Sequence, residues 1–207
     1  MKARMNQRLI TISVFVFLMI TACSYIPKEP IFLNEKENLS KFSAEYGVLA
    51  FEPDTGIENL EISLDIRNTG TKDLYRISLT PPLRLYKVVS VFGKVVRSEE
   101  VETDNITKTI ALFGLPAGTY LPEFLHIRKE QSSGNISATG DQIDIEKNSI
   151  TYLGLFKIAY ETNILGVANS ASVFFDGATG VNEISSVASD EIQKMKVIER
   201  NVKFTGH

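Results

Sequence analysis

The feature that most constrains the fold of this chain is a regular alternation of apolar and polar residues in several short segments. In the clearest of them every second residue is a large aliphatic one: Leu60, Ile62, Leu64 and Ile66. The residues on the opposite side include Glu61, Asp65 and Arg67. Because successive side chains of a β-strand point to opposite faces, this spacing predicts a strand that is buried on one side only.

Turn-forming residues follow this strand, and another alternating segment follows the turn. Asn68, Thr69 and Gly70 favour a tight turn, so residues 60–66 and 74–80 are expected to form a hairpin. Further segments have the same strand-like character: residues 46–51, 83–92, 108–113, 119–128, 141–146, 150–160 and 170–177. Short strands at such spacing are typical of all-β folds. We therefore expect a mainly β fold, an antiparallel β-sandwich, as one domain over residues 41–204.

One helix is expected near residues 183–196, with Asn182 as its N-cap. Its apolar residues are spaced so that they fall on a single stripe of a helix: Ile184, Val187, Ala188, Ile192 and Met195. A stripe of this kind is buried when a helix packs on another element. The helix is therefore expected to pack on the sandwich.

The first 22 residues have the composition of a secretory signal. Lys2, Arg4 and Arg8 precede an apolar or hydroxyl-bearing run at residues 9–20. A helix of about 12 residues reaches only about 18 Å, well short of the roughly 30 Å core of a bilayer. This segment is therefore expected to be a cleaved signal peptide, not a membrane-spanning helix.

The end of the apolar run, Ile20-Thr21-Ala22-Cys23, resembles the lipobox of bacterial lipoproteins. The resemblance implies cleavage before Cys23 and lipidation of its thiol, which anchors the chain to a membrane. Ser24 in the next position implies transfer to the outer membrane, facing the periplasm, in an organism with two membranes. The alternative is a signal without a lipid and a cysteine present by chance. Residues 23–40 are then expected to be the lipidated cysteine and a tether.

Charge and cysteine content limit the classes of partner. Without Lys2, Arg4 and Arg8 the chain keeps 19 of its 22 basic residues against 25 acidic ones, a formal charge of about −6. Nucleic-acid binding needs a basic surface, so no nucleic-acid partner is expected. Cys23 is the single cysteine, so no disulfide forms within the chain.

The segment "ALFGLPAGTYLPEFLHI" at residues 111–127 is the most distinctive internal stretch. Its "LPAGTY" turn resembles that of transthyretin-like and carboxypeptidase-regulatory-like β-sandwich domains. The resemblance implies a fold and no particular activity. We expect a positive φ at Gly118, where the chain turns, and a buried side chain at Tyr120 in the strand that follows.

No catalytic, cofactor-binding or metal-binding residue is predicted. Asp54-Thr55-Gly56 matches the aspartic-protease triplet, but those enzymes need two copies, and a surface turn is favoured. A serine triad would have to use His126, for which a structural or surface role is favoured. The acidic run at residues 99–104 would suit calcium, and Asp176 lies in another loop considered for a metal, but charged loops explain both.

A basic segment at residues 74–98 is open to a functional and a structural interpretation. Residues 74–98 contain basic residues and no acidic one: Arg76, Arg84, Lys87, Lys94 and Arg97. Such a face suits an anionic lipid or a glycan, and a solvated strand surface explains it equally well.

These observations predict a non-enzymatic, lipid-anchored cell-envelope protein that contacts the membrane through Cys23. It would bind another envelope component, with a protein favoured, through sheet edges or loops. One alternative is a lipoprotein that binds a glycan or small ligand, although the chain lacks tryptophan. A second alternative is a hydrolase with an unrecognised site.

Overall fold

The computed structural model describes residues 30–33, 42, 44–53, 60–91, 94–97, 101–103, 110–129, 132–162, 168–176, 184 and 188–206. These residues are mainly in strands, which confirms the expected class. The strands are β1 (Ile31–Phe32), β2 (Tyr46–Glu52), β3 (Leu60–Asn68), β4 (Leu74–Ser78), β5 (Leu83–Val91), β6 (Lys94–Arg97), β7 (Val101–Thr103), β8 (Ala111–Pro116), β9 (Gly118–Lys129), β10 (Ser132–Gly140), β11 (Ile143–Ile145), β12 (Ser149–Thr162), β13 (Ala168–Asp176), β14 (Lys196–Glu199) and β15 (Lys203–Gly206).

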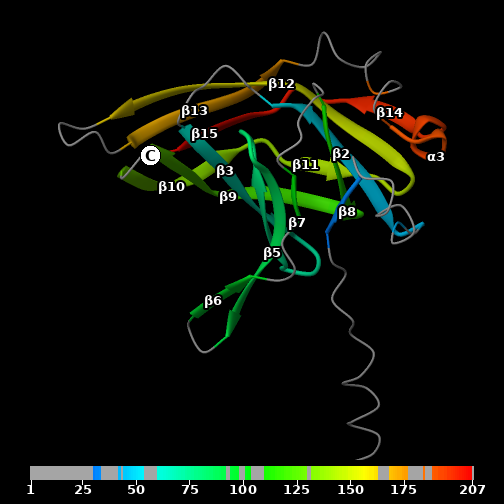
Figure 1. Cartoon of the computed structure of the whole chain (residues 1–207), viewed down its shortest axis with the longest axis horizontal. Helices are drawn as coiled ribbons and strands as arrows, with labels where there is room; N and C mark the ends of the chain where they lie inside the picture. The colour runs from blue at the N-terminus through cyan, green and yellow to red at the C-terminus, as the bar shows by residue number, and fades with distance from the viewer. Residues whose placement is uncertain are drawn as a thin grey trace, which may run out of the picture.

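The described strands form one continuous, curled and barrel-like sheet (Figure 1). Its order is β1-β8-β2-β12-β13-β15-β10-β9-β3-β4-β5-β6, with β11 on β9, β14 on β12 and β7 on β5. Strand β10 joins the two halves, because its first six residues pair with β9 and its last three pair with β15. The expected hairpin of β3 and β4 is confirmed, with Arg67 opposite Leu74.

The pairing is not antiparallel throughout, which corrects part of the predicted architecture. Strand β12 runs parallel to β2 and also parallel to β14. Parallel neighbours are joined by long crossovers and not by tight turns. No local turn signal therefore marks their direction in the sequence.

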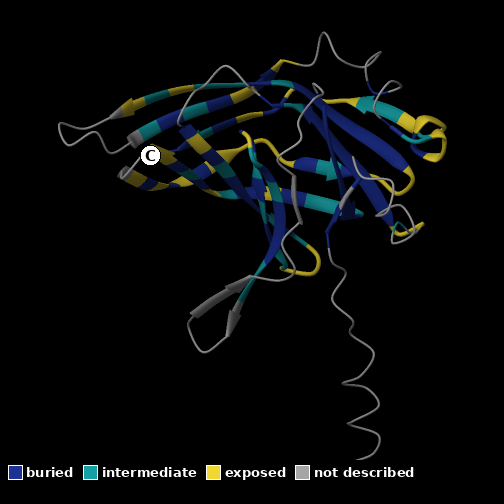
Figure 2. Ribbon diagram, viewed as in Figure 1, coloured by how far each residue is buried: buried dark blue, intermediate teal, exposed yellow. Residues whose placement is uncertain are grey.

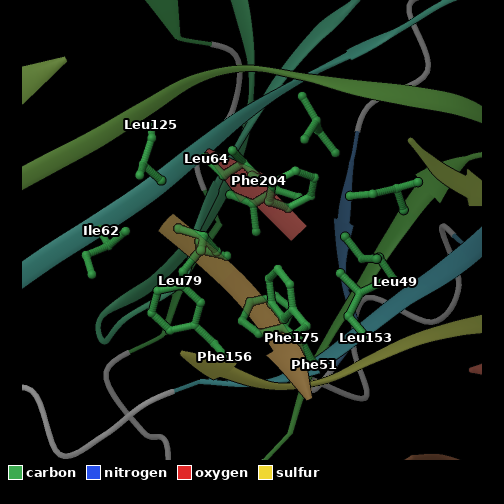
Figure 3. Packing of buried hydrophobic residues seen from close by; sticks show 14 of the residues in the cluster. Leu49, Phe51, Ile62, Leu64, Leu79, Leu125, Leu153, Phe156, Phe175 and Phe204 are labelled. Carbon is green, nitrogen blue, oxygen red and sulfur yellow. The ribbon is translucent and has the colours of Figure 1, made fainter. Parts of the chain in front are cut away.

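The two halves of the sheet share one core (Figure 3). Leu49 and Phe51 of β2 belong to the same buried cluster as Leu64 of β3 and Phe204 of β15. A second cluster lies on the other side of β2 and contains Val48 and Ala50, which alternate with the first pair. Strand β2 is therefore buried on both faces, as its dark colour in Figure 2 shows.

The C-terminal helix differs from the expectation. Helix α3 covers Asp190–Gln193, and Ser189 before it is an extended N-cap whose side chain accepts from the Ile192 amide. Ile184 is also helical, and Lys196 already begins β14. One continuous helix over residues 183–196 is thus not confirmed. Ile184, Ala188 and Ile192 are nevertheless buried together in the second core cluster.

Residues 30–33, which fall in the range expected to be a tether, pack on the domain. Ile31 lies opposite Gly114 in the β1–β8 pair, and the Leu33 amide donates to the Leu112 carbonyl over 2.8 Å. Ile31 and Leu33 are both buried. The folded domain therefore includes chain before residue 41.

The 114–119 stretch is a corner between two parts of the sheet, not a hairpin. Strand β8 pairs with β1 and β2, whereas β9 pairs with β3, β10 and β11. The expected positive φ of Gly118 is confirmed at +157°. Tyr120 is fully buried, as expected, and donates its hydroxyl to the Pro116 carbonyl over 2.6 Å.

Candidate functional site

Most residues singled out from the sequence do not come together in the described structure. Cys23, Ser24 and the Asp54-Thr55-Gly56 triplet lie outside the described residues, and so do the side chains of the acidic run at residues 99–104. Asp176 is exposed and pairs with Lys157 over 2.9 Å. The described residues hold no group of three or more His, Cys, Asp or Glu side chains placed to bind a metal. They also include no helix that is long and apolar enough to cross a membrane.

The candidate site lies on the polar face of β3, β4, β5, β9 and β10. Strand register builds it, because residues directly opposite each other on paired strands share a face. One row across this face contains Asp65, Arg76 and Tyr86. The neighbouring row contains Ser63, His126 and Asn135. Residues that are far apart in the sequence therefore meet on one surface.

Asp65 and Arg76 form the centre of this face. The Arg76 Nε and Nη2 atoms donate to the two carboxylate oxygens of Asp65 over 2.5 and 2.7 Å. Asp65 is 2% exposed, and the Arg76 side chain is 24% exposed. The Arg76 guanidinium also lies 5.9 Å from the centre of the Tyr86 ring. A bidentate ion pair of this kind fixes both side chains in position.

His126 extends the network from β9 to β10. Its Nε2 lies 2.9 Å from Asp65 Oδ2 and 2.7 Å from Arg76 Nη2. Its Nδ1 lies 2.7 Å from Asn135 Oδ1, within hydrogen-bond distance. Both ring nitrogens of His126 therefore have partners.

The environment of Asp65 acts on its acidity in two opposing ways. Burial by itself raises the pKa of this carboxyl, because the charged carboxylate loses its hydration. Hydrogen bonds from Arg76 and His126, with their charges, act in the other direction and leave the pKa below its usual value. Asp65 is therefore a carboxylate that its neighbours stabilise.

A hollow of about 200 Å³ opens over this network, and we call it the polar hollow. Most of its lining residues are polar: Glu61, Ser63, Arg76, Ser78, Thr80, Arg84, Tyr86, His126, Arg128, Ser133 and Asn135, beside Ile62, Pro82, Ile127 and Gly134. Arg128 and Glu61 lie 3.7 Å apart at the rim, and both are more than half exposed. An exposed pair of this kind contributes little to stability.

The basic segment at residues 74–98 is divided by the fold. Arg76 pairs with Asp65, and Lys87 pairs with Asp73 over 2.7 Å in a largely buried contact. Arg84 lines the polar hollow. The side chains of Lys94 and Arg97 lie outside the described residues.

Asp65, His126 and Ser63 are the residue types of a serine triad, but their arrangement differs from one. A triad histidine uses one ring nitrogen for the aspartate and the other for the serine hydroxyl. Here the second nitrogen faces the Asn135 amide oxygen. The described geometry therefore does not present His126 as a base for Ser63.

Sequence reasoning did not identify Asp65 and Asn135 as members of a site. The alternation did place Asp65 on the face opposite Leu64 and Ile66, and Arg76 was noted only as part of a basic segment. Strand β10, which carries Asn135, was not predicted at all. A signal was present at Ile136 and Ala138, whose spacing is that of a half-buried strand.

Comparisons with protein-family models, with curated proteins and with solved structures found no match to this chain.

Proposed function

We propose that this chain is a lipid-anchored cell-envelope protein that binds another envelope component and has no enzymatic role. The observation that carries the anchor is the segment Ile20-Thr21-Ala22-Cys23 after a basic and apolar leader. Two or more acyl chains on Cys23 would hold the protein firmly, since each buried methylene contributes about 0.8 kcal/mol. Ser24 favours the outer membrane, facing the periplasm.

The non-enzymatic part of the proposal is supported by the polar face. His126 is the one histidine among the described residues. Its two ring nitrogens lie within hydrogen-bond distance of Asn135 and Asp65. A general base needs a nitrogen within reach of the proton that it removes. His126 therefore gives the hydrolase alternative no support as a general base.

For the domain we propose a specific fold, a transthyretin-like or carboxypeptidase-regulatory-like sandwich. Its support is that inward-facing residues of both halves of the sheet, such as Leu49 and Leu64, belong to one core. Inner faces that share a core are the basis of a sandwich. A partner protein would then bind at a sheet edge, of which β6 is one end of the strand order.

A small-ligand or glycan-binding role is the second candidate. The observation that favours it is the polar hollow, because several polar groups that converge on a concave surface can fix the orientation of a polar ligand.

Metabolic labelling with a palmitate analogue tests the anchor. The wild-type chain should be labelled and should fractionate with the outer membrane, and Cys23→Ser should be neither labelled nor retained. Equal labelling of the two chains would refute the anchor. Crosslinking in intact cells then separates the candidates, because a discrete protein partner supports the first and a recovered glycan supports the second.

A further inference from the structure

We propose that the polar hollow and Phe124 together bind a neutral glycan chain, with one sugar ring in the hollow and the adjoining ring against Phe124. This proposal deepens the second candidate above and rests on it. It does not depend on lipidation of Cys23. It is supported by the charge balance of the hollow, by its hydrogen-bonding groups and by the exposed aromatic ring at its edge.

The charged residues around the hollow occur in pairs of opposite sign. Each arginine of the lining has an acidic residue as its neighbour: Arg76 with Asp65, Arg128 with Glu61, and Arg84 with Glu102. The first two are ion pairs, and the members of the third lie opposite each other in the register of β5 and β7. The formal charges of these residues cancel, so the hollow suits a neutral ligand better than an ionic one.

The uncharged lining offers both hydrogen-bond donors and acceptors. Ser63 and Ser78 lie opposite each other on β3 and β4, and a serine hydroxyl both donates and accepts. The exposed Asn135 has its Oδ1 2.7 Å from His126 Nδ1, and its amide nitrogen supplies two further donors. Ser133 adds another hydroxyl from the same strand. Sugar hydroxyls also donate and accept, so several of them find partners in this lining.

The floor of the hollow is fixed before a ligand arrives. Asp65 is buried and lies within hydrogen-bond distance of Arg76 and His126. His126 in turn contacts Asn135. The floor therefore connects β3, β4, β9 and β10 through side-chain contacts. Binding to a fixed floor costs less conformational entropy than binding to mobile side chains.

The size of the hollow limits it to one ring of the chain. Its volume of about 200 Å³ is below the roughly 300–1,000 Å³ of drug-sized pockets. Tyr86, the one aromatic phenol of the lining, is 5% exposed and already has Arg76 near its ring. The hollow therefore holds a sugar ring mainly through hydrogen bonds, and the next ring of the glycan lies beyond its edge.

Phe124 provides an apolar surface at that edge. It lies two residues before His126 on the same face of β9, its ring centre is 6.4 Å from that of His126, and it is 38% exposed. One side of a sugar ring is formed largely by C–H groups, which bury apolar area when they pack on an aromatic ring. Phe124 therefore provides the contact for the sugar ring that adjoins the one in the hollow.

Saturation-transfer NMR on the purified mature protein tests the proposal, in a detergent with a polyoxyethylene head group because glycoside detergents would compete. The probes are cellobiose, maltose, lactose and N,N′-diacetylchitobiose, with their constituent monosaccharides and glucuronate. At least one disaccharide should bind with a Kd on the order of 1 mM, about tenfold more tightly than its monosaccharides, because its second ring contacts Phe124. Glucuronate should bind no more tightly than glucose, and added salt should leave disaccharide binding unchanged.

Variants locate the two rings. Phe124→Ala should weaken disaccharide binding about tenfold and leave monosaccharide binding unchanged, because it removes only the contact of the second ring. Ser78→Ala should weaken both by about threefold, since its hydroxyl belongs to the hollow. Phe174→Ala is the matched control, because this ring is 39% exposed on β13, and the variant should bind like the wild type. The replaced phenylalanines are exposed, so both variants are expected to fold, and circular dichroism checks each chain.

Several results would overturn the proposal. Absence of binding by every disaccharide, or tightest binding by glucuronate, would remove the neutral-glycan class. Unchanged disaccharide binding in Phe124→Ala, or loss of binding in Phe174→Ala, would place the ligand elsewhere. A glycan recovered by crosslinking in cells, with no disaccharide binding here, would overturn this site and leave the second candidate standing. Failure of palmitate labelling alone would refute the anchor and leave the hollow unaffected.

Discussion

At the scale of single residues, Asn68 connects two parts of the fold. Its buried side-chain oxygen accepts hydrogen bonds from the amides of Gly70 and Thr71, each over 2.9 Å, and so shapes the turn between β3 and β4. Its side-chain nitrogen lies beside Gly118, where a Cβ atom would approach to 2.6 Å. The β8–β9 corner and the β3–β4 turn therefore depend on each other.

Replacement of Gly118 should disturb both turns. Gly118→Val should lower the free energy of unfolding by more than about 1 kcal/mol, because a β-branched residue is strained at φ +157° and would displace Asn68. Urea titration measures the change. Gly70→Ala is the matched control, since its Cβ would meet only Asn68 Oδ1 at 3.3 Å. A Gly118→Val chain as stable as the wild type would contradict the corner described here.

Tyr120 combines an apolar ring with a buried, hydrogen-bonded hydroxyl. Its ring packs edge-on against Tyr75 at 5.9 Å, and burial raises the pKa of its hydroxyl, which stays a neutral donor to Pro116. Tyr120→Ala should cost about 3–5 kcal/mol through the cavity that it leaves. Tyr120→Phe should cost about 1 kcal/mol, because only the hydroxyl and its hydrogen bonding are lost. Similar urea midpoints for the two variants would show that the ring contributes little.

Asp65 should make stability depend on pH. Asp65→Asn leaves Arg76 without its carboxylate and should cost about 2–3 kcal/mol at pH 7. Because the folded pKa of Asp65 is lowered, its contribution is fully present above the unfolded pKa of about 3.9 and is lost as the pH falls through the folded value.

The difference in unfolding free energy between wild type and Asp65→Asn should therefore shrink as the pH falls below about 4. Urea titrations at several pH values measure it. Asp176→Asn, at an exposed pair, is the control and should show little change. A difference that does not shrink in acid would mean that the Asp65 charge is not what stabilises this face.

At the scale of elements, alternation predicted the strands whose two faces differ. Strands β3, β4 and β9 were identified because one face is buried and the other meets solvent. Strand β10 was missed because Ser, Gly and Asn dominate it and resemble a loop, although Ile136 and Ala138 face the core. The predicted burial is confirmed for Ile184, Ala188 and Ile192 of the helical stripe, but the extended Ser189 interrupts the helix. Packing in the second core cluster, and not helix propensity, holds these residues.

The same cluster predicts that β1 is part of the domain. Leu33→Ala should cost about 2–4 kcal/mol, since this buried leucine packs in the second core cluster. A chain that begins at residue 41 should likewise be less stable than one that begins at residue 30. Thermal unfolding of the two chains measures this difference. Equal stability of the two chains would show that residues 30–33 belong to the tether and not to the folded domain.

At the scale of the whole molecule, the sequence predicted the class but not the order of the strands. Neighbours such as β2 and β12 are about 100 residues apart and parallel, so no turn between them reveals their pairing. The polar hollow was equally hidden, because its groups come from five strands and meet only through register. Local patterns determine which face of a strand is buried, and long-range pairing determines which polar residues meet.

The proposed anchor and the fold together restrict where the domain lies. Only seven residue steps separate Cys23 from Pro30, which limits their span to about 25 Å. The chain therefore joins the domain at the end where β2 and β12 begin, since β1 runs parallel to β2 through their common partner β8. In a lipidated protein this end should lie nearest the membrane.

Energy transfer from a dye to an acceptor lipid in liposomes measures this orientation. Lys147→Cys places a dye beside the start of β12, and Ala159→Cys places it ten residues beyond Ser149, up to about 33 Å further along the strand. The lipidated Cys23 does not react with the dye, and transfer should be stronger at position 147. Insertion of 20 Gly and Ser residues after residue 29 should weaken it by lengthening the link. Cys23→Ser, which lacks the lipid, should show no transfer at either position. Equal transfer at positions 147 and 159, unchanged by the insertion, would show that the short link does not orient the domain.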